Sequence, residues 1–204
     1  MAESTNSDAA AASGEWEAQL AAHRSRLRQM VAFRLDRRLA GRVDPSDVIQ
    51  ETYLEATTRR HEFEAKPQHG LFLWLRFLAL QKVITLHRHH VGRAMRSANK
   101  ERPIEVDGGS NTSAAMAIQI VDRNVGPGSA VAQAEMADRL TAALDLMEPT
   151  DREVLALRHF EQLTNAEAAD VLGLTVSAAS KRYLRALARL KQMLTEHDLL
   201  LSAE

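Results

Sequence analysis

The sequence predicts an all-α protein made of two small helical domains joined by a flexible linker. Apolar residues occupy 45% of its 204 positions and aromatic residues only 4%, a composition that suits helical bundles better than a β-sandwich. Apolar residues also recur at helical spacings in several segments, and helix-start signals precede several of them. Helices are therefore expected in both domains.

The composition also excludes several classes of protein. The chain has no cysteine, so disulfides, thiolate metal sites and a cysteine nucleophile are absent. Its first residues have neither the basic start nor the apolar core of a signal peptide, and no eighteen apolar residues run together. We expect a cytoplasmic protein without membrane insertion and without a cofactor.

The first domain is predicted over residues 15–91, after a disordered tail at residues 1–14. Its first helix should run from near Glu15 to Gly41, with apolar residues at helical spacing: Leu20, Leu27, Met30, Val31, Leu35 and Leu39. Asp44 and Pro45 are an N-cap and a first-turn proline, and they predict a second helix as far as Phe63. A loop at residues 64–70 and a third helix at residues 71–90 complete this domain.

Residues 92–128 are rich in glycine, serine and proline, and they predict the linker, with some local order around residues 114–121. The second domain is predicted over residues 129–196, followed by a tail at 197–204. It opens with a helix over 129–147. Two capping boxes, Thr150 with Glu153 and Thr164 with Glu167, predict the starts of two further helices. A last helix should begin between residues 175 and 177.

Charge is segregated along the chain although the net charge is only -1. Residues 44–64 contain six acids and two bases, whereas residues 65–100 contain seven bases and no acid. Residues 171–195 contain five bases and again no acid. Two separate basic segments, with an acidic one beside the first, indicate nucleic-acid contacts in both domains.

The second basic segment lies on a predicted helix-turn-helix. A short capped helix ends at Gly173, which suits a left-handed turn, and a longer helix follows. The exposed face of that second helix is expected to present hydroxyls and cations for phosphates and base edges: Ser177, Ser180, Lys181, Arg182 and Arg185. The alternative is that this polar pair of helices is only a solvated surface.

Two sets of motifs resemble those of the sigma-70 family of bacterial RNA polymerase sigma factors, of the extracytoplasmic-function type. LMEPTDREVLALRHFEQLTNAEAADVLGL at residues 146–174 and SKRYLRALARLK at 180–191 resemble region 4. DPSDVIQETYLEA at 44–56 and WLRFLA at 74–79 resemble region 2. The likeness covers about residues 24–90 and 132–194. It implies a transcription initiation factor that directs core RNA polymerase to promoter DNA and is not an enzyme.

The resemblance implies that the acidic second helix binds the clamp helices of the largest polymerase subunit, and that the flap of the second largest subunit is a further partner. The candidate polymerase contacts are Asp47, Gln50, Glu51, Leu54 and Glu55. Opposite charges on the two proteins would steer this docking. The alternative is that these acids only cap and solubilise a helix, which suits Asp44 and Asp47 best.

The resemblance also implies that the third helix and the loop before it melt and read the minus-10 element, and that region 4 reads the minus-35 element. The candidate minus-10 contacts are Lys66, Trp74, Gln81, Lys82, Arg88 and His89. Relatives often have asparagine at the position of Gln81, and the recognition helix has Ala178-Ala179-Ser180 where many have threonine, valine and lysine. The base sequences that are read therefore do not transfer to this chain.

Two of these interpretations have alternatives. Trp74 stands alone in an apolar helix, where a tryptophan is more often part of the core than a base-stacking residue. The group His87, His89 and His90 suggests a metal site, but adjacent helix positions do not converge on one ion. Phosphate contacts are the better interpretation of these histidines, and no metal is expected.

Other functions remain as alternatives at this stage. A helix-turn-helix activator that binds duplex DNA without joining the polymerase would need a β/α receiver or a ligand-binding sheet domain, and no period-two pattern precedes Gly92. An enzyme would need a phosphate loop, a nucleophile elbow or paired metal ligands, and none is found. Many members of the resembled family are held by an anti-sigma partner, which no residue here identifies.

Overall fold

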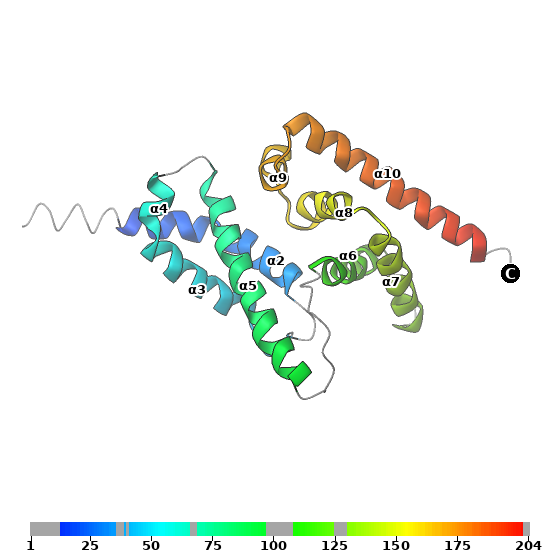
Figure 1. The fold of residues 1–204 in the computed structure, drawn as a ribbon, viewed down its shortest axis with the longest axis horizontal. Helices are drawn as coiled ribbons and strands as arrows, with labels where there is room; N and C mark the ends of the chain where they lie inside the picture. The colour runs from blue at the N-terminus through cyan, green and yellow to red at the C-terminus, as the bar shows by residue number, and fades with distance from the viewer. Residues whose placement is uncertain are drawn as a thin grey trace, which may run out of the picture. The chain divides into compact units, whose positions relative to one another are not determined.

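The computed structural model describes residues 13–35, 39, 41–65, 69–96, 108–124 and 130–201. These residues form helices, turns and short connections without a strand, which confirms the all-α fold class (Figure 1). The chain divides into two compact units, Met1–Gly92 and Arg93–Glu204. The predicted tail at residues 1–14 lies outside the described part of the chain except for Ser13 and Gly14, which are already helical.

The first predicted helix is interrupted in the structure. Residues 13–22 are helical, a turn follows at His23, and α2 runs from Arg24 to Arg34. The amide of His23 donates to the carbonyl of Leu20 at 3.1 Å, an i to i−3 bond that ends the first stretch. The predicted end at Gly41 was therefore too late, although Gly41 does form a turn, with φ of +83°.

The second predicted helix begins where the sequence indicated. Asp44 is the N-cap of α3 (Pro45–Thr58), and one of its carboxylate oxygens accepts from the amide of Ser46 at 2.7 Å. This bond lowers the pKa of the Asp44 carboxyl. The helix breaks at Arg59, and the short α4 (Arg60–Ala65) follows, so one predicted helix is two.

The third helix, α5 (Leu71–Arg96), continues past the predicted end at His90. It supplies much of the core of the first unit together with α2 and α3. The buried apolar side chains of these three helices are Leu27, Met30, Val31, Phe33, Val48, Ile49, Ala56, Phe72, Leu75, Leu78, Ala79 and Val83. Thr52 is also buried, and its hydroxyl donates to the carbonyl of Val48 at 2.7 Å, which satisfies it inside α3.

The middle of the predicted linker is a helix, α6 (Gly108–Asn124), which packs against α7 (Ala130–Asp145) in the second unit. Met116, Ala117 and Val121 of α6 are buried. The glycines and serines near its start obscured an apolar pattern that covers the face of α7. The flexible part of the predicted linker therefore excludes residues 108–124, and it also excludes residues 92–96, which belong to α5; its other residues, 97–107 and 125–128, lie outside the described residues.

The helix after α7 does not have the predicted capping box. The N-cap of α8 (Pro149–Leu155) is Glu148, whose side chain makes no cap hydrogen bond, and Pro149 is the first helical residue. Thr150 is therefore inside the first turn, where its hydroxyl cannot cap the helix. A π-helical turn at Ala156–Phe160 continues α8, and Gln162 then has a φ of +57°.

The helix-turn-helix is confirmed in its details. Thr164 caps α9 (Asn165–Leu172) and accepts from the amide of Glu167, whose side chain accepts in return from the amide of Thr164. Gly173 ends α9 in the left-handed conformation, with φ of +63°. The long α10 (Val176–Leu201) then packs along α8 and α9 (Figure 1).

Candidate nucleic-acid and protein interfaces

The predicted recognition helix, α10, presents a stripe of polar residues to solvent. Thr175 begins the helix, because its hydroxyl accepts from the amide of Ala178 at 3.2 Å. Ser177, Lys181 and Arg185 follow at intervals of four residues, and all three are exposed. Residues spaced by four share one face of a helix, so these side chains form a single hydroxyl and cation stripe. Ser180 is only half-buried beside it.

Arg182 differs from the other predicted contacts because it is bound inside the second unit. Its Nη1 donates to Oδ1 of Asp151 on α8 at 2.8 Å, and the two side chains retain 30% and 15% of their exposure. The ion pair fixes α10 against α8. Arg182 is thus a residue that positions the recognition helix, and sequence alone could not reveal its partner thirty-one positions away.

A second contact supports the same helix from the π-helical turn. The Arg158 guanidinium lies 5.6 Å from the ring centre of Tyr183 on α10, and its Nη1 donates to the carbonyl of Leu163. The Tyr183 hydroxyl lies 3.4 Å from Nδ1 of His159. The buried side of α10 includes Ala179, Ala186 and Leu190. These contacts leave the stripe of Ser177, Lys181 and Arg185 on the opposite, solvent side.

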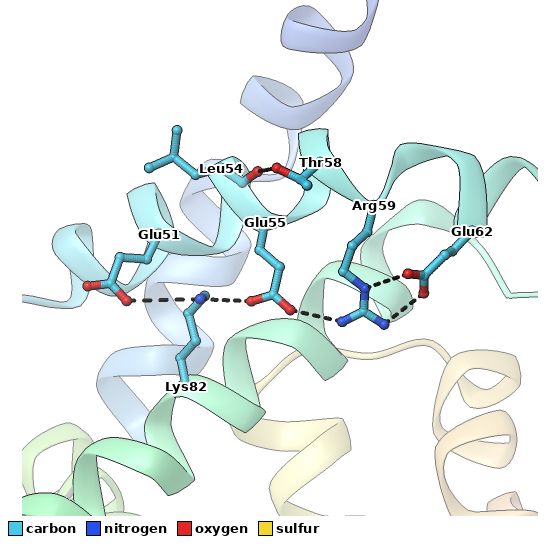
Figure 2. Close-up of polar contacts among 7 residues, drawn as sticks. All are labelled: Glu51, Leu54, Glu55, Thr58, Arg59, Glu62 and Lys82. Carbon is cyan, nitrogen blue, oxygen red and sulfur yellow. Dashed lines mark hydrogen bonds and ion pairs between the residues drawn. The ribbon is translucent and has the colours of Figure 1, made fainter.

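The predicted polymerase-binding residues of α3 form an exposed face. Asp47, Gln50 and Glu51 are exposed, and Leu54 is 71% exposed among them. The face therefore offers charge that can steer a protein partner and one apolar side chain that a partner can cover. Figure 2 shows Leu54 pointing away from the ion pairs on the other side of α3.

A shallow groove beside Leu54 extends this face toward the helical segment at residues 13–22. It is lined by Glu17, Leu20, Ala21, Arg24, Gln50, Tyr53, Leu54 and Thr57. The Tyr53 hydroxyl donates to the carbonyl of Leu20 at 2.6 Å, and burial raises the pKa of this tyrosine. The contribution of residues 13–24 was missed from the sequence, because only the fold brings that segment against α3.

Glu55 is predicted to bind the polymerase and Lys82 to bind DNA, but in the structure they bind each other. Lys82 Nζ lies 2.8 Å from Oε2 of Glu55 and 3.9 Å from Oε2 of Glu51 (Figure 2). Arg59 donates to the second oxygen of Glu55 at 2.8 Å and also binds Glu62 through two bonds. Hydrogen bonds from Lys82 and then Arg59 lower the pKa of the Glu55 carboxyl.

The other predicted minus-10 residues fall into three groups. Gln81, Arg88 and His89 are exposed on α5. Trp74 is half-buried and stacks on Phe63 with ring centres 5.3 Å apart and 29° between the planes. Its other neighbour is the buried Trp16, at 6.5 Å, so the structure agrees with the core alternative for Trp74. Lys66 lies outside the described residues.

Two exposed apolar residues of α5 were missed from the sequence. Phe77 is 52% exposed and Ile84 is 38% exposed. Together with Gln81 and Arg88 they follow the helical repeat i, i+4, i+7, i+11, which places all four on one face of α5. Since the first half of α5 is apolar nearly all round, its sequence pattern did not show which aromatic residue faces solvent.

Among the described residues, no three histidine, cysteine, aspartate or glutamate side chains come together as a metal site would require. His89 is exposed, and the side chain of His90 lies outside the described set. None of the described helices is both long and apolar enough to cross a membrane.

Comparison with known proteins decides the family. The family described as Sigma-70, region 4, matches residues 137–190. RNA polymerase sigma factor CnrH of Cupriavidus metallidurans is 30% identical over 152 residues, which are 74% of this chain and 73% of that protein. The chain belongs to the sigma-70 family of RNA polymerase sigma factors. Its predicted place in the extracytoplasmic-function group is confirmed as well.

Further relatives match a shorter part of the chain. The RNA polymerase sigma-E factors of Streptomyces antibioticus and Streptomyces coelicolor are 40% identical over 65 residues, which are 31% of this chain and 36% and 37% of theirs. A solved structure of CnrH in complex with the cytosolic domain of CnrY is 23% identical, with a TM-score of 0.47, and covers 89% of this chain and 88% of that one.

Membership of the family establishes what the sigma factor does. It acts in promoter-directed transcription initiation, as predicted from its two sets of motifs. The family consists of transcription factors that are not enzymes. The matched region 4 includes α9 and α10 as far as residue 190, so the family match and the exposed cationic stripe fall on the same element.

Proposed function

We propose that this sigma factor divides its work among three surfaces, each on a separate helix. The exposed face of α3 binds the clamp helices of core RNA polymerase, α5 melts and reads the minus-10 element, and α10 reads the minus-35 element. The observation that carries the proposal is the segregation of charge: exposed acids gather on α3, exposed cations gather on α10, and the described exposed face of α5 carries Arg88 and no acid. Opposite charge attracts polymerase to one surface and DNA to the others.

For α10 we propose a major-groove contact made by the stripe of Ser177, Lys181 and Arg185. Arginine and lysine suit guanine or phosphate, and serine suits either a base edge or a phosphate. Val176, which is 50% exposed at the start of the helix, supplies an apolar surface of the kind that contacts a thymine methyl group. Arg182 acts indirectly, through its ion pair with Asp151.

For α5 we propose that Phe77 rather than Trp74 stacks on an unpaired base. Strand separation exposes base faces, and an exposed aromatic ring is the side chain that holds them. Phe77 shares its face with Gln81 and Arg88, which provide an amide for a base edge and a cation for phosphate. Lys66 remains a proposed contact of the preceding loop.

For α3 we propose that Asp47, Gln50, Glu51, Leu54 and Glu55 meet the clamp, with Leu54 as the apolar centre and the groove along residues 13–24 as its extension. The flap of the second largest subunit is the proposed partner of the second domain. The described helices include none that could cross a membrane, and we place this factor in the cytoplasm, where core polymerase is found.

We also propose a regulatory protein partner of the anti-sigma kind. The relative CnrH has been solved in complex with the cytosolic domain of CnrY. The exposed Leu54 and its groove offer an inhibitor the same surface that we assign to the polymerase. A partner bound there would compete directly with core binding. We further propose the division into residues 15–91, a linker and residues 129–196, with α6 attached to the second domain.

The experiment that tests the division of surfaces is Glu51→Lys. Because Glu51 is 68% exposed, the substitution reverses charge on the polymerase face without removing a buried group. Binding to core polymerase should weaken by about tenfold or more, as expected where like charges are brought together, while DNA contact persists. Glu135→Lys on α7 is the control, because it makes the same charge change at a side chain with 61% exposure. Loss of DNA contact without loss of core binding would contradict the assignment.

A further inference from the structure

Lys82 stands between two surfaces that the proposed function assigns to different partners. It belongs to α5, the proposed minus-10 helix, and its ammonium lies 2.8 Å from Glu55 and 3.9 Å from Glu51 on α3, the proposed polymerase helix. Figure 2 shows its side chain reaching from α5 up to both carboxylates. The Lys82 side chain keeps only 20% of its exposure in this position. A lysine held in this way is less available to a DNA strand than an unpaired one.

The charged groups around Lys82, which are Glu51, Glu55 and Arg59, differ in the number and length of their ion pairs. Arg59 has two partners, since it binds Glu62 through two bonds as well as Glu55. Glu51 is exposed and contacts Lys82 only at the longer distance. If Glu55 were given another cation, Arg59 would still be held by Glu62, whereas Lys82 would lose its main partner. Lys82 is therefore the member of this network that is easiest to release.

On α5, Lys82 lies close to other basic groups that face solvent. His89 lies seven residues farther along, which places both on the same side of the helix, and His89 is exposed. Arg88 is exposed next to it. A lysine has a flexible four-carbon stem and binds phosphate as a point charge, so a released Lys82 would extend the cationic edge formed by Arg88 and His89.

We propose that Lys82 is exchanged between the two interfaces: it is bound by Glu55 and Glu51 in the free sigma factor, and it is released to the DNA backbone when basic groups of the polymerase occupy those carboxylates. This inference rests on the proposed function. It makes polymerase binding and DNA binding favour each other through one side chain, and such coupling is reciprocal by thermodynamic necessity. It also keeps the DNA-binding surface of α5 weaker until the factor has joined the enzyme.

The first test measures the salt dependence with which the free full-length chain binds a labelled single-stranded oligonucleotide. The double variant Glu51→Gln with Glu55→Gln releases Lys82, so the slope of log K against log salt should steepen by about 0.7, the value of one additional phosphate contact. At 0.1 M salt this corresponds to about fivefold tighter binding. The same two substitutions in a Lys82→Gln background should leave the slope unchanged.

Asp47→Asn is the control for a general effect of removing an acid, because Asp47 belongs to the same exposed face and lies outside the Lys82 network. Circular dichroism establishes that each variant is folded, and the single variant Glu55→Gln repeats the measurement with less change to α3. The proposal is overturned if the slope rises equally with Asp47→Asn, or if it rises in the Lys82→Gln background.

The second test separates exchange from a purely structural role of Lys82. If polymerase must displace Lys82, then Lys82→Gln removes a competitor, and the affinity for core polymerase should rise by about twofold to fivefold, the strength of one exposed ion pair. If Lys82 only stabilises the packing of α3 against α5, the affinity of Lys82→Gln for core polymerase should be unchanged or weaker. If the unmodified chain does not bind core polymerase, the proposed function is wrong. If it binds core polymerase but Lys82→Gln binds no more tightly, only the proposed exchange of Lys82 is wrong.

Discussion

Two arginines on α10 illustrate how residues of one type acquire different roles. Arg185 is exposed on the proposed DNA stripe, whereas Arg182, three positions earlier, donates to Asp151 across the packing of α10 on α8. Their sequence environment is nearly the same, a basic run without acids. The difference comes from the direction each side chain takes around the helix, which changes by about 100° per residue.

This difference predicts separate effects of alanine at the two positions. Arg182→Ala leaves Asp151 unpaired at 15% exposure, so the free energy of unfolding should fall by about 1 kcal/mol. Arg185→Ala should change stability by less than about 0.5 kcal/mol but weaken binding to duplex DNA. Urea denaturation followed by circular dichroism, together with a DNA titration, measures both. Equal losses of stability in the two variants would refute the positioning role of Arg182.

The two aromatic residues of α5 allow a similar comparison. Phe77→Ala removes a ring that is 52% exposed, so it should reduce promoter melting while core binding and stability remain near normal. Trp74→Ala removes a ring stacked on Phe63 and should lower the free energy of unfolding by about 3 kcal/mol. Permanganate reactivity of unpaired thymines reports the melting, and melting that is intact in Phe77→Ala would show that the ring does not stack on a base.

The sequence shows where cations and acids lie along the chain, but it does not show which of them form ion pairs with one another. The pairs of Lys82 with Glu55 and of Arg182 with Asp151 join separate helices. Such pairs depend on how helices pack, and helix periodicity contains no information about it. For the same reason the sequence favoured a core position for Trp74 but did not identify Phe77 as the exposed ring of α5.

At the scale of elements, local signals predicted helix ends where the capping residue acts through its own side chain or its own backbone conformation. Asp44, Thr164 and Gly173 each act as predicted, because an N-cap oxygen or a left-handed glycine needs only its immediate neighbours. The breaks at His23 and Arg59 and the π-helical turn at Ala156–Phe160 were not predicted. They depend on tertiary packing that overrides a continuous apolar pattern.

The two predicted capping boxes give a direct test at this scale. Thr164→Ala removes the bond to the amide of Glu167 and should cost about 1 kcal/mol of stability. Thr150→Ala is the matched change, and because Pro149 already begins α8, no cap bond is lost there. Denaturation midpoints compare the two. A cost at Thr150 as large as that at Thr164 would mean that α8 is capped as the sequence suggested.

For the whole molecule, the important feature is that the proposed DNA-binding residues occur in both compact units. Each proposed surface alone offers few candidate contacts: Phe77, Gln81, Arg88 and His89 in the first unit, and the stripe of α10 in the second. A polymerase that holds both units converts the second contact into an intramolecular one, which raises the effective concentration of that surface at the promoter. The factor should therefore bind promoters weakly by itself and strongly as part of the enzyme.

The helix α6 reduces the extent of the linker that the sequence predicted between the two units. The sequence suggested a linker of residues 92–128, but burial of Met116, Ala117 and Val121 makes residues 108–124 part of the second unit. The segment that precedes α6 is therefore what connects it to α5, and the segment after α6 lies within the second unit. Glycine and proline content predicted a boundary in this region, while the small residues at the start of α6 concealed its apolar face.

The most direct test of the account combines the purified full-length chain with bacterial core polymerase and a genomic DNA library, and maps the 5′ ends of the transcripts. We expect initiation at a specific set of promoters only when both the chain and the core enzyme are present, with Glu51→Lys reducing it and Glu135→Lys leaving it unchanged. Tight binding of the chain alone to duplex DNA, without association with core polymerase and without specific initiation, would contradict the account.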